Sequence, residues 1–525
     1  MARRDRDRGR GERDPDEVFD FETESGFDDL DLDEHIDFGD LEEETDTGSG
    51  TGSGTPRPGG DGGTDGAGSN RAIVLGLIIL VIAVGLALSA MFPASEPVAT
   101  AGGGDVQQVW FCPDTPGGGK VGSATISVVN LTESQMEGTV TYLSGDGAAP
   151  PDPKPVTVKA FGRATVSAAD SLGGRPGAAI VTLPPGAAAV AEQVTRSAED
   201  PKGVAAYPCA STSSTEWYFP SGSTKAGRQQ SLVLVNPSQD AAIVDVTFRT
   251  EAGEERPEKG SGVSLPPRSQ TILDIDANLV IRRDNVATVV RTERGRVVAA
   301  QRISVDGAAG FGEGLGAPAA SNTWYLTGGR SGGGQTQSIG VFNTTGDPGT
   351  YTVSVDADQQ GQIVPPLVDQ ELDPGVATTV DMSEIGSDAA AGYEIETTVP
   401  SVVDQIRGFE AGRAYVEGVT QTARRWALPA SSDDARADTI EVLNPGSEQV
   451  DVDVYSLRAD GSDRLEALGD GFALPGGSRV SITLSDLKAP AGPAGIVVAA
   501  SDGVVAARSF AAAGDRAVEV GSPLP

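Results

Sequence analysis

Short runs in which apolar and polar residues alternate dominate the chain beyond residue 106. Examples are TVTYLS at 139–144, VDVTFRT at 244–250 and VDVYSL at 452–457. Because successive side chains of a strand point to opposite faces, this alternation indicates strands with one face buried. Asn-Pro, Asp-Gly and Pro-Gly pairs separate the runs and favour turns. The pattern therefore predicts an all-β protein built from many short antiparallel strands.

The strands recur in four copies. The four tryptophans lie 107, 107 and 102 residues apart, at Trp110, Trp217, Trp324 and Trp426. An asparagine follows each of them by 18 to 20 residues, after an apolar run: Asn130, Asn236, Asn343 and Asn444. Each copy offers about seven short strands in about 105 residues, which favours tandem immunoglobulin-like antiparallel β-sandwich repeats. The alternative is a β-propeller with two blades per repeat, although no half-repeat symmetry is visible.

One segment breaks the β pattern. Residues 72–92 are 21 residues without a charge, and as a helix they would span about 31 Å, the thickness of a bilayer core. A cleaved signal peptide fits poorly, because a leader of 70 residues would precede it. Arg71 and seven further arginines lie on its amino side, whereas the next basic residue after it is Lys120. The sequence thus predicts a single-pass transmembrane helix with the N-terminus in the cytoplasm and the C-terminal region outside.

These features divide the chain into seven parts. Residues 1–70 are expected to form a disordered acidic cytoplasmic tail with a Gly/Ser linker, and residues 71–93 the transmembrane helix. A linker at 94–106 leads to β-sandwich repeats at 107–212, 213–320, 321–422 and 423–525. In the tail, large apolar residues lie among acids, which is typical of a docking motif for a basic cytoplasmic partner; a solvated tail without a partner is the alternative. The aromatic members of this motif are Phe19, Phe21, Phe27 and Phe38.

Charge narrows the range of partners. The formal net charge is −36, and residues 1–70 hold 22 acidic and 7 basic residues. No basic cluster lies beyond residue 13, so nucleic-acid binding, which needs grouped Lys and Arg, is not expected. The expected partners are the lipid bilayer, through residues 72–92, and an envelope protein or glycan.

Histidine usage argues against an enzyme. The only histidine, His35, lies in the tail, so the outer region has no residue for Ser-His-Asp or Cys-His catalysis or for a histidine-ligated zinc. No glycine-rich phosphate loop joins a strand to a helix. A carboxylate-pair hydrolase stays formally open because acids are abundant. The sequence predicts no catalytic residue, no cofactor and no metal site.

The marked residues favour structural roles. A tryptophan at one place in every repeat reads as part of the core, with a sugar-stacking platform as the alternative. The asparagines are expected to turn the chain between strands. Cys112 and Cys209 open and close the first repeat, and outside the membrane such a pair is usually a disulfide; two free thiols are the alternative.

The repeated phrases WFCP, WYFP and WALP, with the apolar-Asn-Pro and Leu-Pro turns, resemble an uncharacterised actinobacterial family of membrane-anchored envelope proteins. The resemblance covers roughly residues 70–525 and supplies no catalytic residues. Thr327 replaces the proline of the phrase, and Asn130 and Asn343 lack the following proline, so repeats one and three diverge. The resemblance implies a non-catalytic envelope scaffold or interaction protein. A glycan- or wall-polymer-binding module is the second hypothesis and a carboxylate-dependent hydrolase the third.

Overall fold

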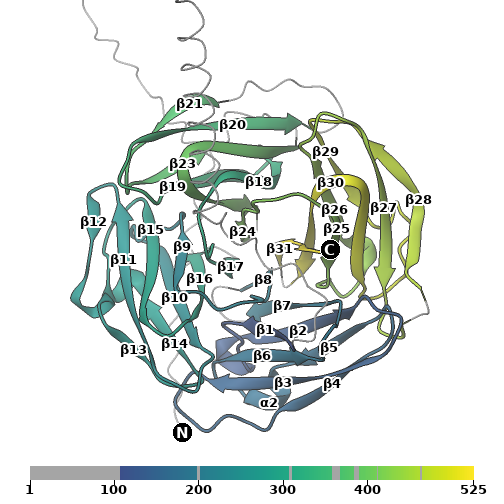
Figure 1. Cartoon of the computed structure of the whole chain (residues 1–525), viewed down its shortest axis with the longest axis horizontal. Helices are drawn as coiled ribbons and strands as arrows, with labels where there is room; N and C mark the ends of the chain where they lie inside the picture. The colour runs from purple at the N-terminus through teal and green to yellow at the C-terminus, as the bar shows by residue number, and fades with distance from the viewer. Residues whose placement is uncertain are drawn as a thin grey trace, which may run out of the picture. The chain divides into compact units, whose positions relative to one another are not determined.

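Each repeat folds as two antiparallel sheets that face each other across an apolar core in the computed structural model (Figure 1). The structure describes residues 107–197, 202–306, 310–357, 367–382, 390–410, 412–461, 464–512 and 514–524. The tail, the expected membrane segment 72–92 and the docking motif from Phe19 to Phe38 lie outside these ranges. Within them, no helix has the length and apolarity needed to cross a bilayer.

Repeat one shows the common topology. Its elements are β1 (Gln108–Cys112), η1 (Gly119–Val121), β2 (Ser123–Asn130), β3 (Met136–Ser144), β4 (Lys154–Val158), β5 (Arg163–Ser167), α2 (Ala169–Leu172), β6 (Gly177–Leu183), β7 (Ala189–Ser197) and β8 (Gly203–Pro208). One sheet has the order β1-β6-β3-β4 and the other β5-β2-β7-β8, all antiparallel. Val140 and Val181 of the first sheet share a core with Ile126 and Ala191 of the second.

Repeat two keeps this order, with the fourth strand split in two. Its elements are β9 (Glu216–Phe219), β10 (Arg228–Asn236), β11 (Ala242–Thr250), β12 (Gly253–Glu255), η2 (Glu258–Gly260), β13 (Val263–Leu265), β14 (Ser269–Asp274), α3 (Ile275–Asn278), β15 (Val286–Arg294), β16 (Val298–Val305) and β17 (Phe311–Leu315). The sheets are β9-β15-β11 with β12 and β13, and β14-β10-β16-β17.

In the last two repeats, one long strand runs through both sheets. Repeat three has β18 (Ser321–Arg330), β19 (Thr336–Asn343), β20 (Gly349–Ala357), β21 (Leu367–Leu372), β22 (Ala377–Asp381), β23 (Ala390–Phe409) and β24 (Gly412–Glu417). Repeat four has β25 (Ala423–Leu428), η3 (Ala435–Ala437), β26 (Thr439–Asn444), β27 (Val450–Leu457), β28 (Glu466–Leu474), β29 (Ser478–Thr483), β30 (Gly495–Ala512), β31 (Asp515–Val520) and β32 (Ser522–Pro523). β23 and β30 each pair with strands of both sheets.

The all-β prediction with paired antiparallel sheets is confirmed, and the propeller alternative is not found. Among the described residues each repeat provides eight strand positions rather than the expected seven, with the split strand of repeat two counted once and the long strands β23 and β30 counted twice; repeat four adds the short β32, which pairs with β25. The extra strand is the last one, β8, β17, β24 or β31, which pairs at one edge with the preceding strand. Runs such as FGEGL (311–315) are rich in glycine, so they lack the β-branched residues by which a strand is recognised from sequence.

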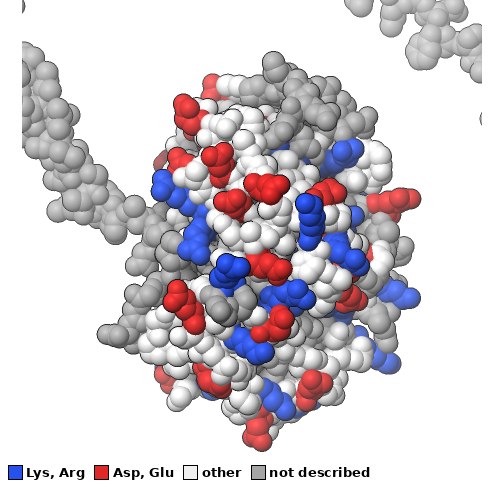
Figure 2. All heavy atoms as spheres, turned by 90° about the vertical axis from the view of Figure 1, so that its right-hand side faces the viewer, with Lys and Arg blue, Asp and Glu red and all other residues white. Residues whose placement is uncertain are grey.

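The four last strands meet at the centre of the repeat region and close it into a ring. β8 packs against β17 and β31, and β24 packs against the same two strands. The first and last repeats therefore lie side by side, as the purple and yellow ribbons of Figure 1 show. On the face drawn in Figure 2, acidic and basic side chains of the described residues are interspersed rather than gathered by sign.

Candidate functional site: a cavity on the ring axis

The tryptophan column converges on one cavity. Trp110, Trp217, Trp324 and Trp426 lie on the first strand of their repeats, and all four line a cavity of about 340 Å³. The carboxyl ends of the four central strands also contribute to the wall. Residues that are 107 or 102 positions apart in the chain are thus brought to one place by the ring.

The indoles are buried rather than displayed. Their exposed fractions are 6, 2, 2 and 0 % in chain order, which leaves no open face for a sugar ring. The Nε1 atoms of Trp217, Trp324 and Trp426 donate to the carbonyl oxygens of Val297, Ser401 and Val504, at 2.9, 2.9 and 2.8 Å. These bonds tie the first strand of a repeat to its late strand. The Nε1 atom of Trp110 is buried without a hydrogen-bond partner among the described residues.

The chemistry of the wall is largely apolar. Small and apolar residues prevail, and no Lys, Arg or His is among the described residues that form it. The one carboxyl among these described wall residues belongs to Glu417 of β24, which accepts a hydrogen bond from the Leu315 amide. Burial raises the pKa of Glu417 to about 8, and the Leu315 hydrogen bond lowers it in part. The group is therefore mainly uncharged at neutral pH.

Asp404 of β23 lies next to this wall and joins repeats two and three. Its Oδ2 accepts from the Ser221 amide at 3.0 Å, and its Oδ1 accepts from the Ser221 hydroxyl. Burial raises the pKa of Asp404 to about 7, while bonds from Ser221 and from Tyr415, a cavity residue, lower it in part. Carboxyl groups beside the cavity thus serve as acceptors that hold neighbouring repeats together.

The same type of contact recurs around the ring. In each repeat the segment that follows the tryptophan docks on the next repeat, and the fourth repeat docks on the first. The bonds are Asp114 N to Gln270 Oε1 (3.1 Å), Ser221 N to Asp404 Oδ2 (3.0 Å), Thr327 Oγ1 to Glu441 Oε2 (3.1 Å) and Ala430 N to Glu192 Oε2 (2.8 Å). Sequence analysis missed these acceptors, because their partners lie up to 238 residues away.

One carboxylate holds the central strands together near their amino ends. Asp515, which is 4 % exposed, accepts from the amides of Val204 at 3.0 Å, Arg413 at 3.2 Å and Arg516 at 2.7 Å, and from the Phe311 amide. These amides come one from each repeat. The equivalent residues of the other strands are Gly203, Gly310 and Gly412. A Cβ on Gly412 would lie 1.5 Å from Asp515 Oδ1, so glycine is required by this close approach.

The interface between the fourth and first repeats contains a pair of buried acids. Glu192 of β7 and Glu519 of β31 are each 1 % exposed, and each carboxyl affects the pKa of the other. Burial raises the pKa of both, and for Glu519 the charge of Glu192 raises it further, so the pair retains a proton. Arg163 donates from Nε to the Pro429 oxygen at 2.6 Å across the same interface. No group of three or more His, Cys, Asp or Glu among the described residues could hold a metal ion.

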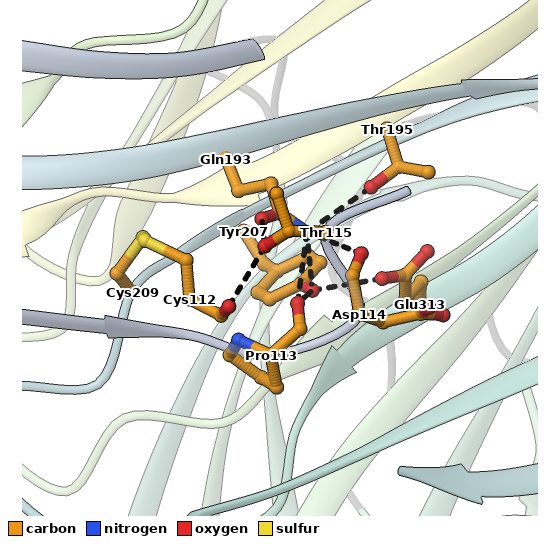
Figure 3. The surroundings of a disulfide bond; sticks show 9 residues. All are labelled: Cys112, Pro113, Asp114, Thr115, Gln193, Thr195, Tyr207, Cys209 and Glu313. Atoms are coloured by element: carbon orange, nitrogen blue, oxygen red, sulfur yellow. Dashed lines mark hydrogen bonds between the residues drawn. A yellow bond between two sulfur atoms is a disulfide. The ribbon is translucent and has the colours of Figure 1, made fainter. Parts of the chain in front are cut away.

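Cys112 and Cys209 form a disulfide that joins β1 to the segment after β8 (Figure 3). Cys209 also lines the cavity. Beside the bond, Gln193 donates to the carbonyl oxygens of Pro113 and Asp114 at 2.9 and 2.8 Å. The Tyr207 hydroxyl donates to Glu313 of repeat two at 2.7 Å. The disulfide thus anchors the loop by which repeat one contacts its neighbour.

The four repeated asparagines make equivalent sets of hydrogen bonds, and each side chain is at most 1 % exposed. Asn236 Nδ2 donates to the carbonyl oxygens of Asp240, Leu265 and Pro266 at 2.8, 3.1 and 3.0 Å, and its Oδ1 accepts from Ser238 N. Asn130, Asn343 and Asn444 bond in the same way to the residue four positions on and to the later turn. The expected turn is present, but the side chain also fixes a second turn about 30 residues away.

Comparison with known families gives one match. A family of unknown function (DUF5719) matches residues 175–408, which run from the end of repeat one through most of repeat three. No curated protein matches the chain.

Proposed function

We propose that the chain is a non-catalytic scaffold or interaction protein of the cell envelope, held at the membrane by residues 72–92 with its ring outside the cell. The observation that carries this proposal is the cyclic closure of the four repeats. Each repeat supplies the same docking segment and receives the equivalent one, and Asp515 binds amides of all four. A ring without a free end is suited to present a fixed outer surface.

The placement of the acids favours binding over hydrolysis. A glycosidase needs two carboxyl groups about 5–10 Å apart on an open cleft. The described wall of the cavity has one carboxyl, Glu417, and Asp404, Glu192 and Asp515 are committed to bonds between repeats. The buried tryptophans likewise disfavour a glycan platform, which needs exposed indole faces.

The anchor and the tail complete the proposal. The anchor rests on the uncharged 21-residue stretch and on the arginines before it. The acidic, aromatic segment 14–46 would bind a basic cytoplasmic partner, so that the chain links the two sides of the membrane.

Crosslinking in intact cells, followed by affinity capture, tests the linking role. The full chain is compared with a variant that lacks residues 14–46 and with a control that lacks residues 48–69 of the Gly/Ser linker. We expect the first deletion to lose cytoplasmic partners and keep envelope partners, and the control to keep both. Recovery of the same partners from all three chains would refute a docking role for the tail.

Topology is tested separately. Protease added to intact, wall-stripped cells should digest residues 107–525, which contain the described repeats, and spare the N-terminal 70 residues. Protection of the repeats until the cells are lysed would overturn the proposed location.

A further inference from the structure

The axial cavity has the size of a ligand site. Its volume of about 340 Å³ falls in the range of small-molecule pockets and equals about 11 groups of the size of water or methylene, at roughly 30 Å³ each. Three of the four central strands contribute to the wall together with the four tryptophans, through Leu315 of β17, Glu417 of β24 and Val520 of β31. The cavity therefore belongs to the assembled ring and to no single repeat.

Charge restricts what the cavity accepts. The described wall offers no basic residue, so an anionic ligand would lie in the cavity without a counter-ion, which disfavours its binding. Glu417 is mainly neutral at neutral pH, so a cationic ligand gains little from it. The wall is thus complementary to an uncharged molecule.

Hydrogen bonding restricts the ligand further. The indoles of Trp217, Trp324 and Trp426 already donate to backbone carbonyls, and the Ser321 hydroxyl donates to the Thr323 carbonyl at 3.1 Å. Glu417 accepts from the Leu315 amide and, in its uncharged form, has one O–H group left to donate. The wall also carries the polar side chains of Ser211, Thr212, Thr420, Gln421 and Ser522, but apolar groups make up more of its surface, so it suits an alkyl chain better than the several hydroxyls of a sugar.

Trp110 is the exception within the column. It lines the cavity and is 6 % exposed, and its Nε1 atom has no partner among the described residues, whereas the three equivalent nitrogens are bonded. A buried N–H without an acceptor is costly, so this donor favours one oxygen atom on the ligand.

We propose that the axial cavity binds an uncharged alkyl chain that carries one oxygen acceptor, such as a fatty alcohol or ester, with that oxygen bonded to the Trp110 indole N–H. The inference does not depend on the tail partner or on the topology proposed above.

The tryptophans provide the assay, because the chain has four of them and all line the cavity. The full chain in lipid nanodiscs is titrated with 10-bromo-1-decanol, whose bromine quenches indole fluorescence on contact. We expect saturable quenching. Trp110→Phe should weaken binding about three- to tenfold, the worth of one hydrogen bond. Ala319→Phe narrows the cavity and should abolish saturation, whereas Ala148→Phe, on an exposed turn, should not.

Two further probes test the chemistry. 10-Bromodecanoate at pH 7.5 should quench weakly and without saturation because it is charged, and 1-bromodecane should bind equally to the wild type and to Trp110→Phe. Absence of saturable quenching by the alcohol, or equal quenching in Ala319→Phe, would overturn the site. Stronger binding of bromodecanoate would overturn the uncharged class. An emission change with methyl glucoside but not with bromodecanol would assign the cavity to a sugar instead.

Discussion

Replacing Asp515 by alanine should destabilise the ring more than any single surface change. The substitution removes the acceptor of amide groups from all four repeats, of which Val204, Arg413 and Arg516 lie 2.7–3.2 Å from the carboxylate. Each buried amide left without an acceptor costs about 1–3 kcal/mol. Allowing for relaxation and for water that reaches the site, we expect a loss of about 3–6 kcal/mol, a large part of the stability of a typical domain.

Asp515→Asn should lie between the wild type and the alanine variant. The amide keeps one oxygen for Arg413 and Arg516, but its nitrogen then faces the Val204 amide, donor against donor. The expected loss is about 1–3 kcal/mol. Asp502→Ala is the matched control, because Asp502 is an exposed acid of the same repeat in a surface ion pair with Arg424, and its loss should stay below about 1 kcal/mol.

Urea unfolding followed by tryptophan fluorescence measures these changes, since the four indoles are buried in the folded ring and become exposed when it unfolds. Hydrogen exchange of the peptides that contain Val204 and Arg413 reports whether the central strands separate at Asp515 before the repeats unfold. The free energies of unfolding of Asp515→Ala and Asp502→Ala could differ by less than about 1 kcal/mol, with the Val204 and Arg413 amides exchanging as in the wild type. That result would show that the Asp515 carboxylate does not hold the ring together.

Three further predictions concern other features. Asn236→Asp places a carboxylate against the carbonyl oxygens of Asp240, Leu265 and Pro266, so the free energy of unfolding should fall by about 3 kcal/mol or more in thermal unfolding. Asn278→Asp, on the exposed end of α3, is the control and should change it little. Equal melting temperatures of the two variants would refute the role of the Asn236 hydrogen bonds. Removing the disulfide with Cys112→Ser and Cys209→Ser together should lower the free energy of unfolding by about 4–5 kcal/mol, the value of the loop-entropy model for a separation of 97 residues. Urea unfolding with and without reductant measures this loss. A wild type whose stability does not change with reductant would contradict the prediction. Burial raises the folded pKa of Glu519 and Glu192 above the value of 4.5 in the unfolded chain, so the fold holds a proton that the unfolded chain releases. The contribution of this pair to the free energy of unfolding should be fully present below pH 4.5 and fall by about 1.4 kcal/mol per pH unit above it, in addition to losses of the same sign from Glu417 and Asp404. Glu519→Gln should flatten that slope despite the neighbouring Arg163, Arg508 and Asp438, and an unchanged slope would assign the pH dependence to other acids.

The repeat signature was readable from sequence because each marked residue acts within its own repeat. Trp217 and Asn236 bond to partners that sit at fixed spacings, so the same spacing recurs in every copy. The cavity and the ring were not readable, because their contacts join different repeats. Val204 and Asp515 are 311 residues apart, and the column of three glycines and one aspartate has meaning only once the last strands are aligned.

The arrangement explains how repeat three, one of the two divergent repeats, still docks on repeat four. In repeat three, Thr327 stands where the other copies place proline, and its hydroxyl donates to Glu441 of repeat four, where the other segments donate a backbone amide. Glu441 is in turn paired with Arg407 at 2.9 Å and Arg479 at 3.6 Å, so this interface is held by charge rather than by one amide. Each junction therefore uses its own acceptor: Gln270, Asp404, Glu441 or Glu192. Of the positions at which the sequence diverges, Thr327 is thus the one that takes part in a junction, and its change from proline goes together with a change in the bond that the junction uses.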